Sequence, residues 1–236
     1  MDAQKNASVK TEFRSAERAQ NSVLAGVEKK TLIWLAERMP RWVNSDHLTA
    51  LSLLAMLLAG ASYWMAQHDR RGLLLVCVWL AVNWFGDSLD GTLARVRGTP
   101  RPRYGFYVDH VVDTFGALFL LGGLALSGYM TPLAAAGLLL GYYILSIEVF
   151  LATYCIGTFH MSFFGMGPTE LRIGLAAANM WLYFTAKVPV VTVLGYDMRA
   201  FDLGALVGMA GMVAFAVASA ARHTRMLYLA EPIKKQ

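Results

Sequence analysis

The sequence predicts an all-α integral membrane protein, with six transmembrane helices preceded by an N-terminal amphipathic helix in the membrane interface. Three observations support this fold class. Hydrophobic residues make up 56% of the 236-residue chain and charged residues only 16%, which is too apolar for an ordinary soluble domain. Six apolar runs are long enough to cross a hydrocarbon core of roughly 30 Å, which takes about 20 helical residues. Basic residues collect in alternate connections between these runs.

The elements follow in order along the chain. Residues 1–47 form a polar N-terminal segment, in which apolar residues recur at helical spacing from Val23 to Val43, and Pro40 is expected to kink or end this helix. Residues 48–221 form the transmembrane domain, and residues 222–236 form a cytoplasmic tail. The six expected spans are Leu48–Gln67, Gly72–Leu93, Gly105–Ser127, Thr131–Tyr154, Thr169–Lys187 and Phe201–Ala221.

The distribution of basic residues predicts the orientation of the chain. Eight lysines and arginines precede the first span, four arginines fill the second connection, and further basic residues follow the last span. Because an excess of Lys and Arg marks cytoplasmic segments, both termini and the aspartate segment, residues 87–113, are expected to face the cytoplasm, at the cell inner membrane if the protein is bacterial. These charges flank apolar spans without a soluble domain to display them, which argues against a nucleic-acid partner.

Four aspartates flank the second connection, at a depth where unpaired carboxylates are costly. Asp87 and Asp90 lie three positions apart and share one helical stripe, and Asp109 shares a face with Asp113. A short turn makes the two helices antiparallel, so the four carboxylates can converge. This oxygen-only ligand set suits two hard divalent cations, Mg²⁺ or Mn²⁺. The alternatives are a salt-bridge network with the nearby arginines and an ion relay in a cation or proton transporter.

Small residues and an arginine lie beside these carboxylates. Gly91 and Ala94 have no side chain that would block a bulky ligand, and a glycine within a helix costs about 1 kcal/mol relative to alanine, which indicates a close approach. Arg95 is placed to meet an anionic group. Metal ions, open backbone and a guanidinium could together hold a pyrophosphate. Arg95 could instead mark only the topology, as Arg97 does, and Gly105 could simply begin a helix.

The run Asp87-x-x-Asp90-Gly91-x-x-Ala94-Arg95, nine further residues and then Gly105-x-x-x-Asp109-x-x-x-Asp113 resembles the signature of the CDP-alcohol phosphatidyltransferase family. Six spans, with the motif bridging the second and third, also fit that family, so the resemblance covers most of the chain. It implies a metal-dependent transfer of a substituted phosphate from a CDP-alcohol to the hydroxyl of a second alcohol, with release of CMP, in phospholipid synthesis. One of the two substrates would be a lipid, and the enzyme would be a homodimer in the bilayer.

The resemblance also implies roles for individual residues. Asp87, Asp90 and Asp109 would be metal ligands, and Asp113 would be both a ligand and the general base.

The nucleotide would lie against a second group of residues. By the family pattern, Gly91, Ala94 and Arg95 would line the CDP site. Residues 45–49 are similar to the family's Pro-Asn-x-x-Thr entry to the first span, which places Thr49 at the nucleotide. The first two of these residues depart from the pattern, and this weakens Asp46 as a nucleotide contact.

Other ionisable residues lie in or near the spans. Glu148 lies within the fourth span, where it could line an acceptor pocket or bond to a neighbouring helix. His110 resembles the family branch that uses CDP-choline or CDP-ethanolamine, but a surface or core role fits equally. We interpret His160, Glu170 and Arg172 as interfacial residues, with contact to an acceptor or headgroup as the alternative.

Small residues in the later spans permit close helix contact. Gly137 and Gly141 lie four apart on the fourth span, and such contacts are expected within one chain rather than between two. Cys77 and Cys155 fall inside spans and are interpreted as packing residues.

Overall fold

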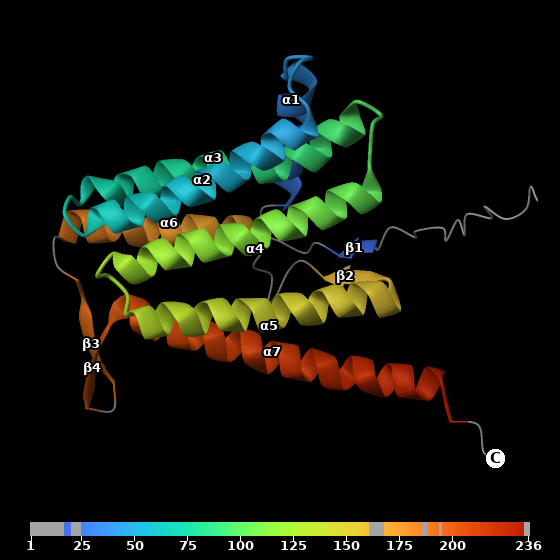
Figure 1. Ribbon diagram of the computed structural model, residues 1–236. Helices are drawn as coiled ribbons and strands as arrows, with labels where there is room; N and C mark the ends of the chain where they lie inside the picture. The colour runs from blue at the N-terminus through green and yellow to red at the C-terminus, as the bar shows by residue number, and fades with distance from the viewer. Residues whose placement is uncertain (1–16, 20–24, 161–167, 186–187, 194, 234–236) are drawn as a thin grey trace, which may run out of the picture.

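The computed structural model describes residues 17–19, 25–160, 168–185, 188–193 and 195–233. Within these residues the chain is mostly helical (Figure 1). The helices are α1 (Ala25–Arg38), α2 (Ser45–Ala66), α3 (Arg71–Val96), α4 (Pro102–Leu126), α5 (Pro132–Ile156), α6 (Pro168–Thr185) and α7 (Ala200–Ala230). Strand β1 (Glu17–Ala19) pairs in parallel with β2 (Thr158–His160), and β3 (Val190–Val193) pairs antiparallel with β4 (Tyr196–Arg199).

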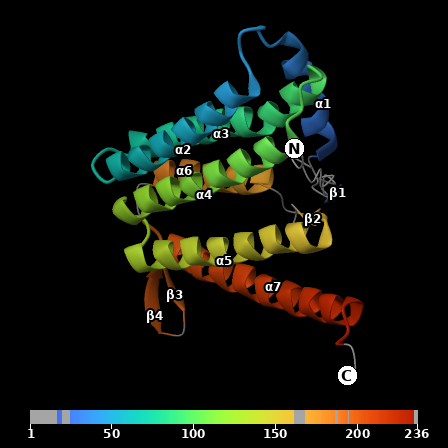
Figure 2. The same ribbon diagram turned by 45° about the vertical axis from the view of Figure 1, so that its right-hand side comes forward.

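Helices α2 to α7 lie side by side in one bundle, and α1 lies across its end, where α3 ends and α4 begins (Figures 1 and 2). Helix α2 packs against both α3 and α4, while α6 covers another side of α3. Helix α5 connects the two halves of the bundle, since it packs on α4 and on α7. The position of α1 across the bundle fits the predicted interfacial helix, although its location in a membrane interface stays a prediction.

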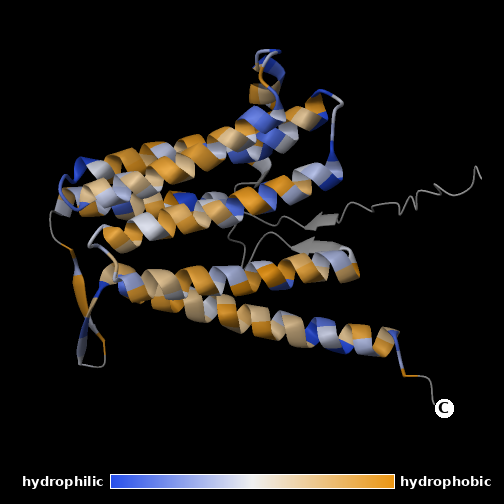
Figure 3. Cartoon of the chain, in the orientation of Figure 1, coloured by the Kyte–Doolittle hydropathy of each residue, from blue (hydrophilic) through white to orange (hydrophobic). Residues whose placement is uncertain are grey.

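Five of the described helices are long and apolar enough to cross a membrane, namely α2, α3, α4, α5 and α7. Figure 3 shows their hydrophobic residues along the length of the bundle, with hydrophilic residues gathered at the connections and on α1. Five of the predicted spans therefore coincide with helices that are long and apolar enough to cross a membrane. Helix α6 occupies the place of the remaining span but is not among the five; its 18 residues extend about 27 Å at 1.5 Å per residue. A sixth crossing stays a prediction.

Local sequence explains where the helices begin and end. Helix α1 ends at Arg38, two residues before Pro40, as expected of a residue that cannot continue a helix. Helix α2 begins with a capping box, in which the Asn44 side chain accepts from the backbone N–H of His47 and the His47 ring accepts from that of Asn44. Helix α7 continues to Ala230 instead of ending near Ala221.

Close backbone contact sets the spacing of the helices beside the aspartates. A Cβ at Gly86 would lie 2.6 Å from the carbonyl oxygen of Leu48, so only glycine allows α3 to approach α2 this closely. Further along, Gly60 of α2 and Gly123 of α4 meet backbone to backbone. The resulting core includes Tyr63, fully buried, whose hydroxyl lies 2.8 Å from the side-chain nitrogen of Asn179 on α6.

The hairpin of β3 and β4 departs from the all-α prediction. Its first strand is a run of Val and Thr, which favour extended backbone, and Gly195 at the turn has a φ of 84° that other residues rarely adopt. This run of Val and Thr lies in a connection between two expected spans, and the helical pattern of the spans gives no indication of it.

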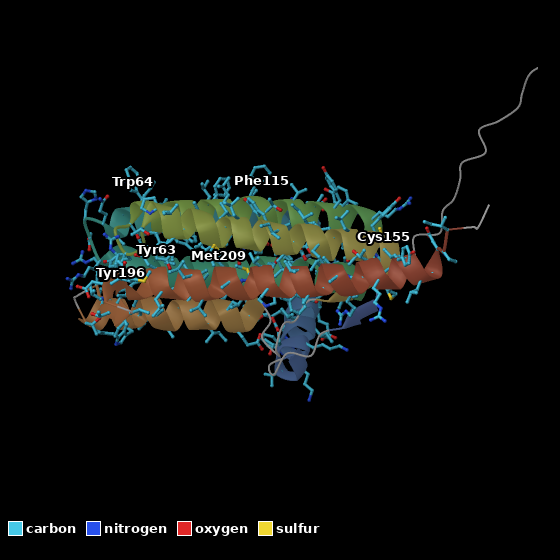
Figure 4. All side chains as sticks on the ribbon, turned by 90° about the horizontal axis from the view of Figure 1, so that it is seen from below. Tyr63, Trp64, Phe115, Cys155, Tyr196 and Met209 are labelled. Atoms are coloured by element: carbon cyan, nitrogen blue, oxygen red, sulfur yellow. The ribbon has the colours of Figure 1, made fainter. Side chains whose placement is uncertain are left out.

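Contacts between α5 and α7 confirm the expected use of small residues within the chain. Positions Gly137 and Gly141 of α5 face Met209 of α7, which is labelled in Figure 4. Trp64 and Phe115 project outward in the same view, with 58% and 50% of their surface exposed, as expected of lipid-facing residues. The interpretation of Cys155 as a packing residue is wrong, because its side chain is exposed.

Candidate metal centre

Three aspartates from two helices form the centre of the candidate site. Asp87 comes from α3, and Asp109 and Asp113 lie one turn apart on α4. One carboxylate oxygen of each lies within 4.8 Å of the others, and all three residues are half-buried. The convergence expected from two helical stripes is thus present for these three residues.

The donor set fits a hard divalent cation. All three candidate ligands are carboxylates, and Mg²⁺ and Mn²⁺ bind oxygen ligands of this kind. Three negative groups at this separation repel one another strongly in a half-buried setting, and bound cations would offset that repulsion. When bound, such ions supply Lewis-acid stabilisation of charge on phosphate oxygens.

The fourth aspartate, Asp90, is held by the first predicted span. The hydroxyl of Thr49 donates to its carboxylate at 2.6 Å, and the hydroxyl of Ser45 donates to its backbone carbonyl at 2.9 Å. Asp90 is therefore placed next to the three-aspartate group on α3 without belonging to it. Its role as a metal ligand stays a prediction, and so does direct contact between Thr49 and a nucleotide.

The last turns of α3 present small residues beside a guanidinium. Among the described residues, a Cβ at Gly91 would meet only the Arg95 side chain within 4 Å, with Nη1 at 3.4 Å, so the helix surface is otherwise open there. Nη2 of Arg95 donates to the hydroxyl of Thr92 at 3.0 Å. Ala94 is half-buried on the same turn, and the space around Gly105 at the start of α4 is open. The nucleotide site assigned to Gly91, Ala94 and Arg95 stays a prediction.

Arg172 of α6 was not predicted to belong to this site. Its Nη2 donates to Asp87 Oδ2 at 2.6 Å, and its Nε donates to Asn83 Oδ1 at 2.8 Å. The sequence favoured an interfacial residue here, and the structure adds that this side chain is only 17% exposed and bonds to a carboxylate of the candidate site. The available signal was Asn83, a polar residue one turn before Asp87 in an otherwise apolar run.

The N-terminal helix is attached to the bundle beside the same aspartates. Glu28 of α1 accepts hydrogen bonds on one carboxylate oxygen from the indole of Trp84 at 2.8 Å, from Ser88 at 3.3 Å and from Thr169 at 2.8 Å. Ser88 directly follows Asp87 on α3, and Thr169 begins α6. Glu28 thus joins α1, α3 and α6 at one point.

Two arginines of the second connection hold the segment between α1 and α2. The guanidinium of Arg97 donates to the backbone carbonyls of Met39, Pro40 and Val43. Arg101 forms an ion pair with Asp46. These residues therefore have local structural partners in addition to any effect on topology.

Two further predicted positions have defined partners. Glu148 of α5 accepts from the ring of His223 on α7, with 2.7 Å between Oε1 and Nδ1, so it bonds to a neighbouring helix. His110 lies 2.7 Å from the carbonyl oxygen of Phe106 and packs its ring against Phe150. The side chain of His160 lies outside the described part of the chain, and Glu170 is half-buried near the start of α6.

The fold and the site together define a multi-pass helical membrane protein with a carboxylate cluster suited to divalent cations. The chain is similar to archaetidylinositol phosphate synthase from Pyrococcus horikoshii, with 30% identity over 104 residues. The aligned part covers 44% of this chain and 52% of the relative, so the chain spans about half the length of the curated protein it matches. No family model matches the chain. The similarity to a phospholipid-synthesising enzyme supports the resemblance seen in the aspartate motif.

Proposed function

We propose that this protein is a membrane enzyme that transfers a substituted phosphate group from a CDP-alcohol to the hydroxyl of a second alcohol and releases CMP. The observation that carries the proposal is the meeting of Asp87, Asp109 and Asp113 within 4.8 Å beside an open helix surface at Gly91. This combination suits metal-assisted phosphate transfer, because cations would be held where a bulky diphosphate can reach them.

The four aspartates would hold two divalent cations, Mg²⁺ or Mn²⁺. Asp87, Asp109 and Asp113 supply ligands from the three-aspartate group. Asp90 supplies a fourth carboxylate, and the hydrogen bond from Thr49 fixes its direction. Asp113 takes the proton of the acceptor hydroxyl. A carboxylate is a weak base for an alcohol, so positioning of the two substrates contributes much of the acceleration.

The nucleotide would bind along the end of α3. Gly91 and Ala94 leave the helix surface open to the diphosphate, and the guanidinium of Arg95 contacts its charged oxygens. Thr49 lies at the edge of this surface, where α2 begins. These assignments are supported by the match of the motif to the family signature and by the open space at Gly91.

One of the two substrates would be a lipid, consistent with a site half-buried among membrane helices. The relative's name specifies an archaetidylinositol phosphate product. We therefore include a CDP-linked lipid as donor and inositol phosphate as acceptor among the substrates to be tested. Small CDP-alcohols with a lipid acceptor form the other arm of the panel.

The membrane arrangement is part of the proposal. With α6 as a sixth crossing beside α3, both termini and the aspartate site face the cytoplasm, where the excess of basic residues lies. The protein would act as a homodimer, as in the family it resembles. A transporter is less well supported, because its carboxylates would follow a path across the membrane, whereas three of these gather at one point.

The test is CMP release by purified protein supplied with Mn²⁺ or Mg²⁺ and the substrate panel. Asp113→Asn should abolish CMP release while nucleotide binding survives, since the base is lost but the nucleotide surface on α3 is intact. Asp197→Asn on the β3–β4 hairpin makes the same chemical change away from the site and should release CMP as the wild type does. Undiminished CMP release by Asp113→Asn would remove Asp113 from the role of base.

A further inference from the structure

Arg172 holds one of the three clustered aspartates through a two-point contact. Its Nη2 donates to Asp87 Oδ2 at 2.6 Å, and its Nε donates to Asn83 Oδ1 at 2.8 Å. Asn83 lies one turn before Asp87 on α3, so both partners lie on the same side of that helix. The guanidinium therefore spans from α6 to two successive turns of α3.

The contact is rigid on the α3 side. Asn83 is 4% exposed, and its amide nitrogen donates to the carbonyl oxygen of Ser52 at 3.2 Å, which fixes the amide between α2 and α3. With its nitrogen committed to Ser52, the amide oxygen of Asn83 must face Arg172. The guanidinium is thus directed toward Asp87 even if the carboxylate changes its own partner.

The contact is also well shielded from water. The side chains of Arg172 and Asp87 are 17% and 18% exposed. A charge-assisted hydrogen bond in such a setting is strong, and its loss leaves a charged group with an uncompensated desolvation cost. A cation bound to Asp87 would bring a second positive charge close to the Arg172 guanidinium, and the two like charges would oppose each other.

We infer that Arg172 is the resident counter-charge of the cluster and competes with divalent cations for Asp87. This inference rests on the proposed metal centre. In the metal-free protein, the guanidinium offsets repulsion among Asp87, Asp109 and Asp113. When a cation binds Asp87, the Arg172 bond to this carboxylate weakens, while the bond to Asn83 retains the guanidinium beside the site.

The proposed competition predicts that the affinity for divalent cations rises when Arg172 is replaced. Loss of Arg172 removes a competitor and leaves the cluster more negative, so cations should bind more tightly. A residue that merely fixes α6 to α3 predicts the opposite, because a loosened site binds cations less well. The metal-free variant should at the same time be less stable than the metal-free wild type, since its carboxylates then lack the neighbouring guanidinium.

The experiment measures Mn²⁺ affinity by titration calorimetry on the full chain in detergent, with electron paramagnetic resonance of free Mn²⁺ as a second readout. Arg172→Met should lower the Mn²⁺ dissociation constant by about tenfold or more, equivalent to about 1.4 kcal/mol. Arg172→Lys retains the positive charge but lacks the planar guanidinium that bonds to both Asp87 and Asn83. It should lower the Mn²⁺ dissociation constant by a smaller factor. Arg41→Met, an exposed position, makes the same change in net charge and should leave the affinity near that of the wild type.

Thermal unfolding in a chelator provides a readout independent of affinity. Arg172→Met should unfold at a lower temperature than the wild type without metal, and Mn²⁺ should raise its unfolding temperature by a larger amount. If Arg172→Met does not fold, Arg172→Lys carries the comparison, because an ammonium still offsets part of the repulsion.

An unchanged or weaker Mn²⁺ affinity in the folded variants would overturn the inference while leaving the metal centre in place. Failure of the wild-type protein to bind Mn²⁺ would be a different result, since it refutes the proposed function on which the inference rests.

Discussion

Replacement of Glu28 tests how the N-terminal helix is held to the bundle. One carboxylate oxygen of Glu28 accepts hydrogen bonds from Trp84 and Ser88 of α3 and from Thr169 of α6. Glu28→Ala removes all three acceptor contacts at once. The two hydroxyls can rotate toward other acceptors, whereas the indole N–H of Trp84 has one fixed direction and is left without its partner.

The expected cost follows from these contacts. A hydrogen bond contributes about 1 kcal/mol net, and a buried donor left without an acceptor costs about 1–3 kcal/mol. The Ser88 contact at 3.3 Å is the weakest of the three. We therefore expect Glu28→Ala to lose about 2–3 kcal/mol of stability. At about 2–4 °C per kcal/mol for a chain of this length, the unfolding temperature should fall by about 4–12 °C.

The assay is thermal unfolding of detergent-solubilised protein, followed by circular dichroism. Glu28→Gln keeps an acceptor oxygen and should lose less than about 1 kcal/mol. Glu37→Ala removes an exposed carboxylate from the same helix and serves as the matched control. A double-mutant cycle with Trp84→Phe should show a coupling of about 1 kcal/mol. If Glu28→Ala unfolds at the same temperature as Glu28→Gln, the three-way contact does not stabilise the protein.

Three other substitutions test the structure at separate points. Gly86→Ala places a Cβ 2.6 Å from the Leu48 carbonyl and should cost about 1–3 kcal/mol in thermal unfolding; unchanged stability would show that α2 and α3 are not held this close. Arg97→Ala removes donors to three backbone carbonyls and should increase proteolysis of the segment between α1 and α2, whereas Arg103→Ala, at an exposed position in the first turn of α4, should not. Glu148→Leu should destabilise the protein by about 1–3 kcal/mol because His223 loses its acceptor, and adding His223→Leu should restore part of that loss; equal losses in both variants would argue against the pair.

The positions of the helices could be predicted because the chain marks them with long apolar runs separated by polar turns. Residues whose side chains bond to a different helix or segment were harder to assign. Arg97 is one of several arginines in a basic connection, and nothing local distinguishes the one that bonds three carbonyls of a distant segment. Glu28 likewise lies in a polar region whose packing on α3 has no periodic signal.

The clustered aspartates of the site could also be predicted from the sequence, whereas their partner on α6 could not. Helical spacing brings Asp109 and Asp113 together within one element, and the short connection between α3 and α4 brings Asp87 to them. Spacing along α3 also suggested that Asp90 would join this group. Its carboxylate accepts a hydrogen bond from the hydroxyl of Thr49 on α2, and its role as a metal ligand stays a prediction. Arg172 lies 85 residues beyond Asp87, and only the packing of α6 on α3 shows that the two are partners.

The central claim is that carboxylates of α3 and α4 hold divalent cations that enable a CDP-alcohol to react. The most direct measurement is CMP release from the substrate panel by wild-type protein, recorded first in a chelator and then with Mn²⁺ restored. The account predicts no CMP in the chelator and recovery of turnover with Mn²⁺ for at least one donor and acceptor pair. Turnover that persists at full rate in the chelator, or no CMP from any pair once Mn²⁺ is present, would contradict it.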